Sequence, residues 1–235
     1  MNYDNPAGRL LAILKKGKTI HGHKVCKDVW FELLQASDDA EMLSRLGLLM
    51  ELSKEAAIKV KEDFPSESES VAHWKSQLNS AFISQNLQSN WQSFIGNIDV
   101  HTINYLSNHS TMLSLISNTK SVVDDDVEKI RDQLLEIYEE ILLSNIEQEI
   151  RIYLIRHIRK ILTGIDEYFL TGALPILEAV ETTIGHAYLH KNYASFLRDE
   201  KLGKKVLDML NATASVVTVA AGLIQIPPVI TLLLT

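Results

Sequence analysis

The sequence predicts an all-α fold: a multi-helix bundle with a small N-terminal helical unit and a C-terminal bundle that contains a long αα-hairpin and an apolar C-terminal helix. Glycine and proline are scarce, at 10 and 5 of 235 residues, which leaves few of the turns that many short strands would need. Apolar residues recur at three- and four-residue steps along most of the chain, as on the buried face of a helix. Only the run "VVTV" (residues 216–219) is typical of a strand.

Composition limits the class of protein. Hydrophobic residues make up 46% and charged residues 23%, as in ordinary globular domains, and the chain is long enough to bury a core without disulfides. Cys26 is the single cysteine, which suits a reducing compartment. The N-terminus lacks the pattern of a signal peptide, so we expect a cytoplasmic protein. A net charge of −7 argues against a nucleic-acid partner.

The N-terminal segment predicts consecutive helices. Asn5 and Pro6 have the N-cap and first-turn pattern of the first helix, and a second is expected at about 24–35. Ser37 or Asp38 is the expected cap of the third, followed by acidic residues at the positive end of the helix dipole.

A fourth helix is expected to start at Ser53 and to end before Pro65. The run "PSESES" (residues 65–70) has the composition of a linker. We therefore expect an N-terminal unit at 1–64 and a C-terminal bundle at 71–235.

Residues 76–119 carry almost no charge, because Asp99 is the only Asp, Glu, Lys or Arg among them. Apolar side chains at near-helical spacing interrupt the Asn, Ser and Gln residues. One interpretation is a pair of helices covered by their neighbours, and the other is a neutral contact surface, since the centres of interfaces are depleted in charge. On the second interpretation a protein partner or another copy of the chain would bind through Phe82, Trp91, Phe94 and Ile95.

The strongest helical periodicity lies at 124–165. Two amphipathic segments are separated by Ser144 and Asn145, which predicts an αα-hairpin. The first segment is mostly acidic outside and the second is basic, so we expect the two helices to pair by charge. The next helix, at about 166–190, should kink or divide near Pro175.

His186 and His190 are the strongest candidates for metal ligands. Their spacing of four residues places both imidazoles on one helical face, and His157 could add a third ligand from the neighbouring helix. The catalytic pattern HExxH fails because Ala187 follows the first histidine. No nucleophile motif or phosphate-binding loop is complete, so we expect no cofactor and no catalytic residues.

The C-terminal segment 209–235 contains no ionisable side chain. Residues 209–226 approach the roughly 20 apolar residues that cross a bilayer core. Polar Asn211 and Gln225 oppose a membrane location, and a helix that is apolar all round is also what the centre of a bundle requires. If the segment does insert, the membrane-facing candidates are Val216, Val219, Leu223 and Ile226.

Three hypotheses about function follow. The first is a non-enzymatic intracellular interaction or regulatory protein that self-associates or joins a larger assembly. The alternative is a membrane-active effector, toxin-like or pore-forming, whose helix 209–226 inserts into a bilayer. A metal protein or enzyme that uses His186 and His190 is a third hypothesis.

Overall fold

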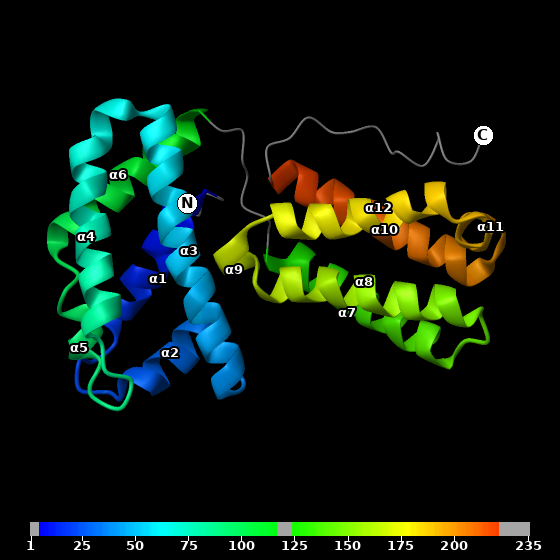
Figure 1. Cartoon of the computed structure of the whole chain (residues 1–235), viewed down its shortest axis with the longest axis horizontal. Coiled ribbons are helices and arrows are strands. Elements are labelled where there is room, and N and C mark those ends of the chain that lie inside the picture. Colours follow the sequence, from blue (N-terminus) through cyan, green and yellow to red (C-terminus); the bar gives the residue numbers. More distant parts are fainter. Residues whose placement is uncertain (1–4, 117–123, 221–235) are drawn as a thin grey trace. The chain divides into compact units, whose positions relative to one another are not determined.

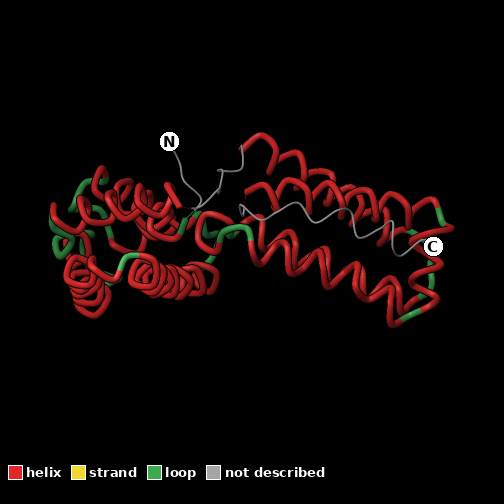
Figure 2. The backbone as a smooth tube through the Cα atoms, turned by 90° about the horizontal axis from the view of Figure 1, so that it is seen from above, coloured by secondary structure: helices red, strands yellow, loops and turns green. Residues whose placement is uncertain are grey.

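The computed structural model describes residues 5–116 and 124–220, and it confirms the all-α prediction. The described residues form twelve α-helices and one 3-10 turn, with no strand among them (Figures 1 and 2). The chain divides into two compact units, Met1–Ser117 and Asn118–Thr235. The expected boundary at 65–70 lies inside the first unit, where Pro65–Glu67 form the 3-10 turn and the next helix begins at Ser68.

The first unit contains the earlier helices. Their bounds are α1 Pro6–Thr19, α2 Cys26–Leu34, α3 Asp39–Asp63, α4 Ser68–Ser84, α5 Gln92–Ile95 and α6 Val100–Ile116 (Figure 1). The Asn5 side chain accepts a hydrogen bond from the Gly8 backbone N–H (2.8 Å), and Asp38 accepts one from Glu41 (2.9 Å), so both predicted caps form. The predicted break at Ser53 is wrong. No glycine or proline interrupts residues 48–64, and α3 continues through a buried Ser53.

Aromatic side chains fill the core of the first unit. The Trp30 ring makes edge contacts with Trp91 and Phe94, at centroid distances of 4.9 and 4.7 Å. The Trp91 indole N–H donates to the Gly17 carbonyl (2.9 Å), and the Trp30 indole N–H donates to the Gln85 side chain (2.8 Å). Both indole N–H groups thus donate to neutral acceptors. A charged side chain in the same place would carry a desolvation cost.

The second unit is a bundle of four long helices, with two shorter helices between them. Its helices are α7 Asp124–Leu143, α8 Gln148–Asp166, α9 Tyr168–Thr171, α10 Leu174–Leu189, α11 Lys191–Asp199 and α12 Lys201–Ala220 (Figure 1). The long helices α7, α8, α10 and α12 contact one another in a closed ring and alternate in direction along the chain. The predicted hairpin is therefore present. The chain breaks after α9 at Gly172, whose φ is 71°, and Pro175 lies in the first turn of α10.

Helix α12 packs against α7, α10 and α11 as the last member of the bundle. Its inward side chains include Val206, Leu210 and Val217, all buried. Of the four membrane candidates, Val216 is half-buried against this core. The Val219 side chain, Leu223 and Ile226 lie outside the described residues. Among the helices described, none has both the length and the apolar character needed to cross a bilayer.

Charge does not organise the α7–α8 pair as expected. Within the described residues, the ion pair between these helices joins Arg131 of the acidic helix to Asp166 of the basic one (2.8 Å). Arg159 instead donates to the Tyr138 hydroxyl (2.8 Å). The pairing therefore depends on the apolar seam, which includes Leu134, Ile141, Leu154 and Ile161.

Candidate functional site

The predicted interaction residues lie in the core of the first unit. Trp91, Phe94 and Ile95 are buried, and Phe82 is half-buried against the Phe94 ring (5.2 Å). None of the three buried side chains presents a surface to a partner while the unit is folded. Many of the polar residues around them, Ser, Asn and Gln, are exposed, so the low charge of this stretch is not explained by burial alone.

A buried histidine meets a half-buried serine and a half-buried carboxylate in the first unit, where sequence reasoning found no signal. The His109 Nε2 atom lies 3.0 Å from the Ser70 hydroxyl and 3.3 Å from Glu67. However, the Trp74 indole N–H donates to His109 Nδ1 (3.2 Å). Neutral His109 therefore carries its proton on Nε2, the atom that a general base would need free toward Ser70. The cluster holds α4 against α6, and its geometry does not activate the serine.

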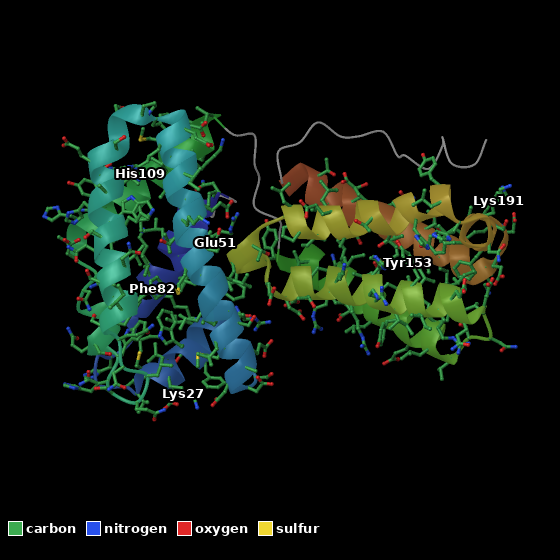
Figure 3. The ribbon with its side chains drawn as sticks, viewed as in Figure 1. Lys27, Glu51, Phe82, His109, Tyr153 and Lys191 are labelled. Atoms are coloured by element: carbon green, nitrogen blue, oxygen red, sulfur yellow. The ribbon has the colours of Figure 1, made fainter. Side chains whose placement is uncertain are left out.

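A column of stacked rings in the second unit is the strongest candidate site. Tyr153 of α8 stacks on His157 of the same helix (4.0 Å between centroids, 28° between planes) and on His186 of α10 (3.6 Å, 12°). Two rings this close to one tyrosine must lie on its opposite faces. His190 stacks on His186 (3.9 Å, 29°), and Tyr193 of α11 meets both Tyr153 and His186 edge-on. We call these five residues the histidine column; Figure 3 labels Tyr153 between α8 and α10, and its side chain is half-buried.

Burial sets the protonation state of the histidine column. It lowers the pKa of His157 and of His186, so both imidazoles are neutral at pH 7. Burial also raises the pKa of Tyr153 to about 12 and that of Tyr193 further. The Tyr153 hydroxyl donates to the Thr182 carbonyl (2.9 Å), whereas the buried Tyr193 hydroxyl has no hydrogen-bond partner in the part of the chain that the structure describes.

The histidine column does not have the geometry of a metal centre. Ring nitrogens bind a metal within the plane of the ring, but His186 and His190 face each other with their planes nearly parallel. Tyr153 separates His157, the possible third ligand, from that pair. No group of three or more His, Cys, Asp or Glu side chains within 5–116 and 124–220 could hold a metal ion.

All residues of the histidine column except His157 line a pocket of about 440 Å³ beside α8 and α10. Apolar Ile152 and Leu189 line the same pocket. Two carboxylates and two cations also line it, and none of the four forms an ion pair within the described residues: Glu147, Glu149, Arg156 and Lys191.

The pocket opens at an end of the bundle where apolar side chains gather. The last turns of α7 and α10 and the first part of α8 meet at this end, near Lys191 (Figures 1 and 3). Among the described residues of the second unit, five of the six large apolar side chains that are exposed to solvent lie here. We call these five residues the apolar end: Leu142, Leu143, Ile152, Tyr188 and Leu189.

Comparisons with protein-family models, with curated proteins and with solved structures found no match to this chain. The candidate site therefore depends on its own geometry. The sequence signal that could have found it is a pair of four-residue spacings, Tyr153 to His157 and His186 to His190. Each spacing brings two rings together on one helix, but the stacking of Tyr153 on His186 depends on how α8 and α10 align.

Proposed function

We propose that this protein is a non-enzymatic helical interaction protein that self-associates through the apolar end of its second unit. The observation that carries the proposal is that five exposed apolar side chains lie on helix segments at the same end of the bundle, with Leu143 88% and Leu189 80% exposed. Large apolar clusters on a folded surface are typical of sites that bind another protein. Burying one leucine side chain fully contributes about 1.5–3 kcal/mol, so a few such residues support a specific contact.

The charges beside the apolar end favour a second copy of the chain as the partner. The pocket wall carries two carboxylates, Glu147 and Glu149, and two cations, Arg156 and Lys191, without ion pairs of their own in the described structure. A two-fold contact brings the same surface of each copy together, so a surface with both signs can oppose acid to base. Exposed pairs add little affinity, but they set orientation.

The test compares two leucines in matched positions. Leu189 is the last residue of α10, and Leu115 is the penultimate residue of α6 in the first unit; they are 80% and 81% exposed. Each is replaced by glutamate, and self-association is measured by sedimentation velocity over a range of concentrations. We expect Leu189→Glu to weaken association at least tenfold, which is about 1.4 kcal/mol, while Leu115→Glu leaves it unchanged.

Three results would contradict the proposal. A wild-type chain that stays monomeric at all concentrations has no self-association to explain. Equal effects of the two variants would remove the apolar end as the contact surface. Flotation with anionic liposomes that is lost in Leu189→Glu but retained in Leu115→Glu would assign this end to a lipid surface instead of a second copy.

A further inference from the structure

We infer that the histidine column makes self-association through the apolar end sensitive to pH: the copies associate while the column is neutral and separate when acid protonates it. The inference rests on the proposed function, because it concerns regulation of the same surface. Three imidazoles in one stacked group are its structural basis.

The column connects the interior of the bundle to the apolar end. His157 is buried between helices, His186 is half-buried, and His190 is exposed at the C-terminal cap of α10. Leu189 precedes His190 directly and lines the same pocket. A change in the packing of the rings therefore acts on residues that neighbour the contact surface.

The surroundings of the column oppose positive charge. Arg156, Lys160 and Glu149 face it from α8, Glu147 from the α7–α8 loop, and Lys191 from the start of α11. Burial lowers the pKa of His157 most, the Tyr153 carbonyl at 2.9 Å raises it in part, and the nearby cations Lys160 and Arg156 lower it again. After burial, the other two imidazoles of the column lower the pKa of His186. Cations thus outnumber carboxylates around a column whose rings lie about 4 Å apart, so each added proton meets repulsion.

In a two-fold contact, protonation charges both copies at the same place. The mixed charges of the pocket wall can no longer balance across the interface once each side gains one or more positive charges. Protonation of both His186 and His190 also places two positive charges in rings that stack 3.9 Å apart. Both effects act in the same direction, toward dissociation in acid.

The test removes the titration of the two imidazoles nearest the apolar end, leaves buried His157 in place, and keeps the rings. The double variant His186→Phe/His190→Phe retains flat side chains that cannot be protonated, and His101→Phe, at an exposed histidine of the first unit, is the control. Sedimentation velocity at about pH 7.5 and about pH 5.5 brackets the ordinary histidine pKa. We expect the dissociation constant of the wild type and of His101→Phe to rise at least tenfold in acid, and that of the double variant to change less than twofold.

The outcomes separate this inference from the proposed function. A wild type that associates equally at both pH values overturns the inference alone, and so does a double variant with the wild-type pH response. Should the double variant fail to associate at pH 7.5, the milder His190→Gln takes its place. Its pH response must then be smaller than that of the wild type, and an undiminished response overturns the inference.

A wild type that is monomeric at both pH values removes the proposed function, and hydrogen exchange then tests the column by itself. Residues 150–157 and 184–193 should lose protection in acid, after correction for the intrinsic exchange rate, in the wild type but not in the double variant. Equal protection in the two proteins at pH 5.5 would overturn the column as a pH-sensitive element.

Discussion

Gly203 lies where helix α12 crosses α11, and there is no room there for a side chain. A Cβ atom built on Gly203 would lie 1.9 Å from the Phe196 carbonyl oxygen and 2.8 Å from the Leu197 Cα. Both obstacles are backbone atoms of α11, which cannot rotate away as the end of a side chain can. We therefore predict that Gly203→Ala forces α11 and α12 apart and destabilises the second unit.

The size of the effect follows from what moves with α11. Phe196 and Leu197 are buried side chains of that helix, and separation of the two helices loosens both from the core. Overpacking a core costs about 1–3 kcal/mol, and obstruction by backbone places this case near 3 kcal/mol. The gain in helix propensity from glycine to alanine, up to about 1 kcal/mol, offsets only part of that cost.

The positions of the tryptophans allow the two units to be followed separately. Trp30, Trp74 and Trp91 are the three tryptophans of the chain, and all lie in the first unit. In urea titrations, tryptophan fluorescence therefore reports the first unit and far-UV circular dichroism reports both. With a slope of about 1.5 kcal/mol/M, we expect the midpoint of the second unit to fall by roughly 1–2 M in Gly203→Ala and the fluorescence midpoint to stay unchanged.

Gly185 of α10 is the matched control, because a Cβ there would meet nothing within 4 Å. Gly185→Ala should raise the midpoint of the second unit through a gain of about 0.5–1 kcal/mol. If Gly203→Ala is as stable as the wild type, or if both alanines have the same effect, the close approach of α11 and α12 is not a constraint on stability and the reasoning is refuted.

Two further predictions concern the buried His109 and the last helix. Burial lowers the pKa of His109, so the unfolded state binds its proton more readily and the stability of the first unit should fall as pH drops below about 6.5. The fall should be smaller in His109→Gln. Urea titrations followed by fluorescence measure it, and an equal dependence of stability on pH in both proteins would contradict the prediction. Val217→Asp places a charge in the core of the second unit and should unfold that unit. The control Ser215→Asp lies on the exposed side of α12 and should change the free energy of unfolding by less than about 0.5 kcal/mol. Similar circular dichroism midpoints for the two variants would show that α12 does not pack as described.

Local signals in the sequence predicted local structure well. The caps at Asn5 and Asp38 form because each side chain reaches a backbone N–H three residues ahead, which requires no tertiary information. The hairpin at 124–165 forms because its apolar seam is continuous. The break expected at Ser53 fails because serine is tolerated inside a helix when its neighbours bury it, as they do in α3.

The candidate site depends on contacts between segments that are distant in the sequence. The sequence could not predict these contacts. Low charge in residues 76–119 is compatible with an interface and with a core, and burial of Trp91 and Phe94 shows that they belong to the core. The pair His186 and His190 was visible as a spacing, but their stacked orientation and the insertion of Tyr153 arise only when α8 and α10 align. The apolar end was likewise hidden, because a leucine at a helix end has the same pattern whether covered or exposed.

The described part of α12 carries no charged side chain after Asp208, and it still has an inside and an outside. Its buried positions Val206, Leu210, Thr213 and Val217 follow one another at steps of three and four residues, and exposed Ser215 lies on the other side. The Thr213 hydroxyl donates to the Met209 carbonyl (2.9 Å), so this polar group is satisfied within its own helix. Small side chains face outward where charged ones are more usual. Absence of charge is therefore no measure of membrane preference in this segment, because the periodicity of side-chain size already assigns one face to the bundle.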